Sequence, residues 1–277
     1  MKKVILVFLA LAMAFTFVAC GTANNDVKPT DEPKTEEPQK LVMATNASFP
    51  TYEFVGENGA YEGIDVEIAG KIAEKLGLEL EIVDTEFGSI IGGVQSGKYD
   101  FGMAGMTVTE ERKKSVDFSD SYATAVQVVI VAADSPYESF EEFYTGFDAD
   151  ENPTGVVEGI KIGVQQDTTG DIYSSDTPDN WGFGQENVIR YKTGNDAVEA
   201  LKAGKVTAVI IDNEPAKSFV AANEGLKILE GAYAEEEYAI CVAKENSDLL
   251  DQINTALQEL TDDGVIADIV EKYIPSK

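Results

Sequence analysis

Residues 97–122 read Gly-Lys-Tyr-Asp-Phe-Gly-Met-Ala-Gly-Met-Thr-Val-Thr-Glu-Glu-Arg-Lys-Lys-Ser-Val-Asp-Phe-Ser-Asp-Ser-Tyr, and they predict a strand followed closely by a helix. Tyr99 to Ala104 is typical of a short buried strand. Thr109 favours a helix start, because its hydroxyl can accept from free N–H groups and the acids after it suit the positive end of a helix. Between strand and helix, Gly105 lets another group approach the backbone closely.

The predicted helix carries Arg112, which is one of only two arginines in the chain. A guanidinium beside free helical N–H groups and the Thr107 hydroxyl can hold a carboxylate through two parallel hydrogen bonds. The same side chain can instead pair with a nearby acid on the surface of a chain that has 50 Asp and Glu residues. The residues alone leave both interpretations open.

The composition argues against several classes of function. A net charge of −29 repels nucleic acid and anionic membrane surfaces, so no nucleic-acid partner is expected. The chain has no histidine, which removes the usual general base and the commonest metal ligand, and no metal or cofactor is expected. Cys241 lies in an apolar run and predicts a buried free thiol without an internal disulfide.

The first forty residues predict a secretion signal and a tether. Met1 to Cys20 has two lysines and an apolar run that is too short for a comfortable membrane span. Its end, Ala19-Cys20-Gly21, resembles a bacterial lipobox, so cleavage there would leave Cys20 as a lipidated N-terminus; an ordinary signal peptide cut near Ala19 is the alternative. Residues 21–40 are rich in proline and charge and predict a flexible tether.

From Leu41 onward, predicted strands and helices alternate, which indicates an α/β protein. Residues 94–99 and 201–206 both read as helix, Gly-Lys, strand. This echo suggests two lobes of like architecture with a cleft between them, where ligands prefer to bind. Segments 135–158 and 174–185 are expected to be surface elaborations of the second lobe.

The run from Ala104 to Arg112, followed by Asp117-Phe118-Ser119 and Tyr122, resembles the extracytoplasmic solute-binding family 3 that serves ABC importers of polar amino acids. The resemblance covers nearly all of residues 41–277. It implies a type II periplasmic-binding-protein fold, in which two α/β lobes are joined by crossover strands with a ligand cleft between them. It also implies a monomeric lipoprotein on the outer face of the cell membrane, or in the periplasm, that delivers an amino acid to permease subunits.

The resemblance and the N-terminal pattern together predict the domain organisation. The predicted segments are 1–20 for the lipoprotein signal peptide with its lipobox Cys, 21–40 for the tether, 41–132 for the first lobe, 133–232 for the second lobe and 233–277 for a return to the first lobe.

An amino acid is a zwitterion, so its receptor must satisfy both a carboxylate and an ammonium as they lose water. The resemblance assigns the carboxylate to Arg112, to the Thr107 hydroxyl and to N–H groups at the helix terminus formed by Thr168 and Thr169, with Gly105 allowing close approach. It assigns the ammonium to Asp212, which follows an apolar strand. The alternative for Asp212 is a helix cap near Pro215.

Four further positions match family residues around the ligand's side chain. The rings of Phe49 and Phe87 are expected to cover that side chain, with ordinary core aromatics as the alternative. Asn46 and Gln165 match positions that select among side chains. Because family members that bind basic amino acids usually have an acid at the position of Asn46, its neutral amide favours a neutral polar ligand such as glutamine. Asp167 is interpreted as a helix cap.

Two other functions compete with amino acid binding for transport. The first is an enzyme on the same fold that resembles dehydratases of cyclic amino acids. The chain has no histidine and no paired-carboxylate motif from which a general acid or base could come, so no enzyme is expected. The second is a ligand-binding surface lipoprotein with a sensory or structural role. The negative charge makes glutamate and aspartate the least favoured ligands.

Overall fold

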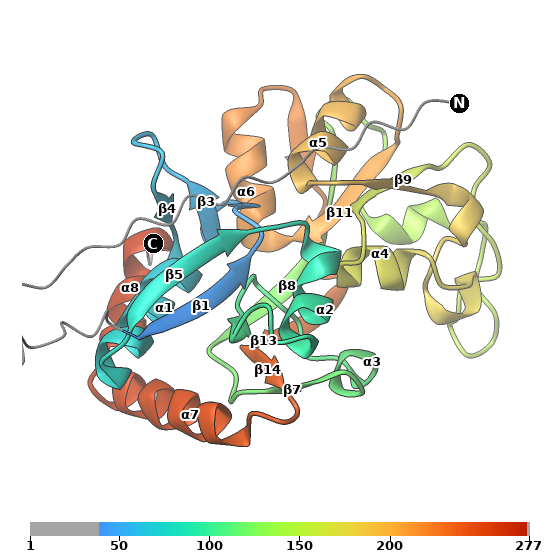
Figure 1. Cartoon of the computed structure of the whole chain (residues 1–277). Coiled ribbons are helices and arrows are strands. Elements are labelled where there is room, and N and C mark those ends of the chain that lie inside the picture. The colour runs from blue at the N-terminus through green and yellow to red at the C-terminus, as the bar shows by residue number, and fades with distance from the viewer. Residues whose placement is uncertain (1–38, 276–277) are drawn as a thin grey trace, which may run out of the picture. The chain divides into compact units, whose positions relative to one another are not determined.

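Two β-sheets, each with its own helices, organise residues 39–275, which are the residues described by the computed structural model (Figure 1). The predicted signal peptide, Cys20 and nearly all of the predicted tether lie outside those residues. No helix within the described range is both long and apolar enough to cross a membrane.

The first sheet has the strand order β5-β1-β6-β14-β7. Its strands are β1 (Lys40–Thr45), β5 (Glu79–Asp84), β6 (Phe101–Gly102), β7 (Val116–Phe118) and β14 (Cys241–Ala243). β1 runs parallel to β5 and β6, whereas β14 runs antiparallel to β6 and β7. The last strand of this sheet therefore comes from the C-terminal part of the chain.

Helices cover both faces of the first sheet. They are α1 (Ile64–Leu76), α2 (Ile90–Gln95), α7 (Ser247–Asp262) and α8 (Val265–Tyr273), and the single turn α3 (Glu110–Lys113) lies near β7. Because side chains alternate along a strand, Met43 of β1 packs with α1, α7 and α8, while Ala44 packs with α2. α7 and α8 thus pack on α1 beside the first sheet, while the assignment of residues 233–277 to the first lobe remains a prediction.

A small antiparallel sheet follows β1 and consists of β2 (Ser48–Phe49), β3 (Glu53–Val55) and β4 (Tyr61–Glu62). It places Phe49 and Glu53 opposite each other in its first strand pair. Both side chains are buried, which matters for the site described below.

The second sheet has the order β10-β9-β11-β8-β12, and β13 also pairs with β8. Its strands are β8 (Ala123–Ala132), β9 (Ile162–Gln165), β10 (Val188–Tyr191), β11 (Ala208–Asp212), β12 (Leu226–Ile228) and β13 (Ala234–Tyr238). Its helices are α4 (Thr169–Ser174), α5 (Gly194–Lys202) and α6 (Asn213–Ala222). Since β9 and β11 are parallel, the residues that follow both strands meet at one edge of the sheet.

The chain enters the second sheet through β8 and leaves it through β13, and these two strands pair antiparallel from Tyr238 opposite Ala123 to Ala234 opposite Gln127. They are the predicted crossover strands. The residue numbers at which the lobes divide, 132/133 and 232/233, remain a prediction.

The segments 135–158 and 174–185 contain more than surface loops. They include η2 (Phe140–Phe143), η3 (Pro178–Asn180) and the start of η4 (Gln185–Asn187). The hydroxyls of Tyr144 and Tyr233 both donate to the carbonyl of Trp181, at 2.5 and 2.8 Å. Phe143 and Phe183 are fully buried among these rings, because the aromatic residues of the two segments pack on each other and on the second sheet. The expectation of surface elaborations is corrected to that extent.

Two predicted elements of the opening stretch are shorter than expected. The strand predicted at Tyr99 to Ala104 contains only β6, and the helix after Thr109 lasts a single turn before β7 begins. One helix, α1, also ends as its sequence predicts, with Gly77 in the left-handed conformation that favours glycine (φ 70°).

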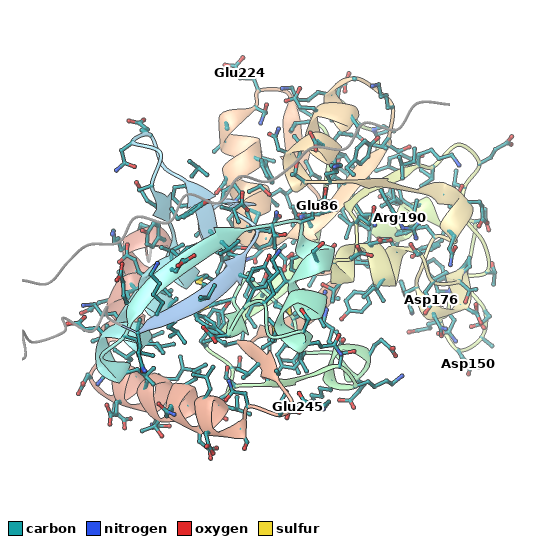
Figure 2. All side chains as sticks on the ribbon, viewed as in Figure 1. Glu86, Asp150, Asp176, Arg190, Glu224 and Glu245 are labelled. Carbon is teal, nitrogen blue, oxygen red and sulfur yellow. The ribbon has the colours of Figure 1, made fainter. Side chains whose placement is uncertain are left out.

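Acidic side chains project from the surface of both lobes, as Glu86, Asp150, Glu224 and Glu245 illustrate (Figure 2). Cys241 is fully buried in β14 as predicted, and burial raises the pKa of its thiol to about 12. That thiol is therefore neutral and poorly reactive at ordinary pH.

Candidate ligand-binding site

One partly enclosed cavity lies between elements of the two sheets. Its twelve lining residues are Asn46, Phe49, Glu53, Phe87, Ala104, Gly105, Thr107, Arg112, Gln165, Thr168, Thr169 and Asp212. All ten residues predicted as ligand contacts from the sequence are among them, and only Glu53 and Ala104 were not predicted. The structure thus brings the predicted residues together, while their contact with a ligand remains a prediction.

Arg112 lies at one end of the cavity with a fixed orientation. Its backbone N–H donates to the cap hydroxyl of Thr109 at 3.1 Å, and its guanidinium donates to the carbonyls of Thr107 at 2.7 Å and Asp167 at 3.1 Å. The guanidinium also lies over the Phe87 ring, 5.2 Å from its centre. These contacts hold the planar group in place without neutralising its charge.

No carboxylate among residues 39–275 forms an ion pair with Arg112, although only 7% of its surface is exposed. Burial lowers the pKa of its guanidinium, and the charge of Glu236 opposes that effect. The interpretation of Arg112 as a surface residue paired with an acid therefore finds no support in the described part of the chain. A buried, unneutralised guanidinium with a fixed plane suits a carboxylate ligand.

Hydroxyl groups from both lobes meet beside Arg112. The hydroxyls of Thr107 and Thr169 are 3.4 Å apart. Thr168 caps α4, since its side chain accepts from the N–H of Asp171, and it donates to the carbonyl of Gln165 at 2.8 Å. The cap is therefore Thr168, and the interpretation of Asp167 as the cap is wrong. Asp167 instead precedes the helix in the left-handed conformation, at φ 65°.

Asp212 is the last residue of β11 and lies in the N-cap position of α6, but its side chain makes no capping hydrogen bond. Its carboxyl accepts instead from the buried hydroxyl of Tyr238. This arrangement argues against the capping alternative and directs the carboxyl into the cavity. Burial, reinforced by the carboxyl of Glu236, raises the pKa of Asp212 well above its usual range. A ligand ammonium would supply the cation that this buried acid lacks.

Gln165 and Asn46 form a neutral pair across the cavity. The Gln165 amide donates to Oδ1 of Asn46 at 2.9 Å, and the Asn46 amide donates to the carbonyl of Thr85 at 2.8 Å. Both Asn46 and Gln165 are buried. The pair joins the two lobes without adding charge.

Gly105 is required by its surroundings. A Cβ on this residue would lie 2.9 Å from the Phe49 ring, and its φ of 50° is in the region that disfavours other residues. The N–H of Gly105 donates at 2.7 Å to Asp65, whose pKa burial raises to about 7. Phe49 therefore packs directly over the backbone that leads to Thr107.

Glu53 was not predicted from the sequence. Only 1% of its surface is exposed, and its Oε2 atom has no hydrogen-bond partner among the described residues. Burial, followed by the charge of neighbouring Asp65, raises its pKa well above the usual range. The available signal was its place on an apolar strand, Tyr52-Glu53-Phe54-Val55, in which an inward-facing acid needs an explanation.

Two lobes around a cavity with a buried cation at one end and buried carboxyls elsewhere define a solute-binding protein that takes a small polar ligand. Residues 41–276 match the bacterial extracellular solute-binding proteins, family 3, and the chain belongs to this family. The family predicted from the sequence is thereby confirmed.

Relatives of known specificity and structure share this architecture. The arginine-binding extracellular protein ArtP of Bacillus subtilis is 31% identical over 275 residues, which cover 99% of this chain and 98% of ArtP. A mutant of ArgBP from T. maritima has a crystal structure with a TM-score of 0.75 and 39% identity, covering 86% of this chain and 96% of that one. An ancestral arginine-binding protein bound to glutamine has a TM-score of 0.75 and 36% identity, covering 87% and 100%. The predicted two-lobe fold is confirmed.

Proposed function

We propose that this protein binds a free polar amino acid outside the cytoplasmic membrane and delivers it, as a monomer, to the permease subunits of an ABC importer. The observation that carries the proposal is the placement of buried Arg112 and buried Asp212 on one cavity. A zwitterion bound there has its carboxylate at the guanidinium and its ammonium at the carboxyl. The arginine-binding relatives support the same function.

Arginine is the favoured ligand because of Glu53. The cavity has one cationic side chain, Arg112, and two acids, Asp212 and Glu53. Once the ligand's carboxylate and ammonium have met Arg112 and Asp212, Glu53 still has no cation to pair with, and neighbouring Asp65 is a second acid. A guanidinium on the ligand's side chain would supply that cation and would favour the charged form of Glu53.

Glutamine is the second candidate. The pair Asn46–Gln165 is neutral and offers amide donors and acceptors, which suits an amide side chain. An ancestral relative was bound to glutamine. The preference for a glutamine-like ligand predicted from Asn46 is not confirmed, and Glu53 is the reason to place arginine ahead of it.

Glu53→Gln is expected to separate the two ligands. A hydrogen bond to a charged group contributes about 1.5–3 kcal/mol, so loss of the carboxylate should weaken arginine binding about tenfold to a hundredfold. Glutamine binding should change less than about threefold, because a neutral amide does not need the charge. Calorimetric titration with arginine, glutamine, lysine and histidine measures both effects.

Glu57→Gln is the matched control, since Glu57 is exposed in the turn that follows β3. It should leave both affinities unchanged. If wild type and Glu53→Gln bind arginine equally well, Glu53 does not determine a preference for arginine. No heat with any amino acid would overturn the proposed function.

We propose binding without turnover. The charged groups of the cavity are accounted for as ionic contacts to a ligand, and the chain has no histidine to act as a general base. Formation of product during the titrations would favour the alternative of an enzyme on the same fold. Absence of binding in all of the amino acid titrations would favour a surface lipoprotein with a sensory or structural role.

We also propose that Cys20 is lipidated and anchors the protein to the outer face of the membrane. The support is the sequence Ala19-Cys20-Gly21 after an apolar run. Cys20→Ser should move the protein from the membrane fraction to the medium or periplasm, because several acyl chains bind a membrane firmly and their loss leaves none.

Cys241→Ser is the control, since it replaces the other cysteine, which is buried in β14. It should remain in the membrane fraction. If Cys20→Ser also remains there, the lipobox interpretation is wrong.

A further inference from the structure

Glu236 is a buried acid on the crossover strand β13, between the exposed residues Glu235 and Glu237. Only 6% of its surface is exposed. Its Oε2 atom accepts from the Gln127 amide at 2.9 Å, while its Oε1 atom has no partner among the described residues. No lysine or arginine within residues 39–275 forms an ion pair with it. The site as described so far gives Glu236 no role.

The sheet register brings Glu236 close to Asp212. Gln127 of β8 lies opposite Asp212 on one side and opposite Ala234 on the other, and Glu236 lies opposite Ala125. Residues that face each other in an antiparallel pair, and residues two apart on one strand, point to the same face of a sheet. The side chains of Asp212, Gln127 and Glu236 therefore share one face. Gln127 is the shared neighbour of the two acids.

Two acids in this position cannot both be ionised at low cost. The carboxyl of Glu236 is, after burial, the main reason that the pKa of Asp212 is raised. The other ionisable groups around the pair are Tyr238 on β13, Tyr173 on α4, Arg112 on α3, and Tyr52 and Glu53 at the start of β3. Two cations are near: Arg112 already faces the proposed carboxylate site, and Lys113, also on α3, lines the groove with Glu236 but forms no ion pair with it.

The two acids line different hollows. Asp212 lines the ligand cavity, whereas Glu236 lines an open groove together with Lys113, Thr124 and Tyr173. Thr107 is the one residue that lines both. The pair thus has one acid at the ligand cavity and one at a solvent-accessible groove.

We propose that Asp212 and Glu236 form one ammonium site that holds a shared proton, and that the ligand's ammonium displaces this proton into the groove. The O–H bond to the carboxyl pair breaks and the proton passes to water. The ammonium keeps its own protons and replaces the lost positive charge. This inference rests on the proposed function, because it assigns the amino group of the same ligand.

The inference predicts that binding releases a proton. The ammonium must compete with the shared proton for the two carboxyls, so affinity falls as the pH falls. At a pH high enough to ionise both acids before the ligand arrives, no proton is released. Coupled titration makes this proton a property of the pair rather than of either residue.

Calorimetry with arginine in two buffers of different ionisation enthalpy measures the number of protons released. Wild type should release a clear fraction of a proton near neutral pH. Glu236→Gln keeps an oxygen that can accept from Gln127 but cannot share a proton, and it should release much less. Glu237→Gln removes the same charge from the neighbouring exposed position and should behave as wild type. Any proton released from Glu53 is common to all three proteins and cancels in the comparison.

A second measurement keeps both Asp212 and Glu236 unchanged, and it tests the inference even if Glu236→Gln does not fold. Infrared difference spectra of Glu53→Gln protein should show the loss of a protonated-carboxyl band when ligand is added. Equal proton release by wild type and Glu236→Gln overturns the inference, as does binding with no proton release and no lost band. Absence of any amino acid binding by wild type overturns the proposed function and this inference with it.

Discussion

Arg112→Lys should weaken amino acid binding by up to about a hundredfold. Lysine keeps the positive charge but loses the planar fork that can meet both oxygens of a carboxylate. It also loses the contacts to the carbonyls of Thr107 and Asp167, which fix the orientation of the guanidinium. Loss of about 3 kcal/mol, the upper value for a hydrogen bond to a charged group, corresponds to about a hundredfold in affinity.

The other arginine of the chain provides the control. Arg190, labelled in Figure 2, lies on the second lobe. It pairs with Asp171 at 2.9 Å, is partly exposed, and does not line the cavity. Arg190→Lys should bind the ligand within about threefold of wild type. Both variants are compared by calorimetry after thermal melting has shown that they are folded. If Arg112→Lys binds as well as Arg190→Lys, the carboxylate receptor lies elsewhere.

Asp212→Asn should weaken binding between about tenfold and more than a hundredfold. The change preserves the shape of the side chain but removes the negative charge that balances the ligand's ammonium in a water-excluded cavity. A charge-assisted hydrogen bond contributes about 1.5–3 kcal/mol, which sets that range. Titration with the preferred amino acid gives the value directly.

Asp167→Asn is the matched control for this second change. Asp167 lies near the cavity without lining it, and asparagine tolerates the left-handed conformation that Asp167 adopts. Its affinity should stay within about twofold of wild type. If Asp167→Asn binds weakly while Asp212→Asn binds like wild type, the assignment of the ammonium site to Asp212 is wrong.

Much of the cavity follows from where polar residues stand relative to strand ends. Thr168 comes soon after β9, and Asp212 ends β11. The parallel course of these strands carries both residues to one edge of the second sheet. Arg112 follows the first strand of the opening stretch after a tight turn. The family resemblance then identified which of these positions face the cleft, and periodicity alone would not have separated Asp212 from a helix cap.

Two buried acids, Glu236 and Glu53, were not predicted from the sequence, although the place of Glu53 on an apolar strand was a signal. Glu236 stands in the run Glu235-Glu236-Glu237, which reads as a solvated face until strand pairing shows that its middle residue points inward. Glu53 is similar, because its burial depends on packing of the small sheet against Asp65 and the cavity. Strand register and packing depend on contacts between segments that are distant in the chain, so the local sequence alone does not predict them.

The two sheets are completed at different times as the chain is synthesised. All six strands of the second sheet lie between residues 123 and 238, so that sheet can form as soon as this segment has emerged. The first sheet starts at β1 but is incomplete until β14 is made, and the apolar face of α1 stays uncovered until α7 and α8 are made. Contacts between such distant segments form slowly, and the waiting surface is open to aggregation. Newly made protein thus has its greatest need of chaperones in the lobe that is begun first.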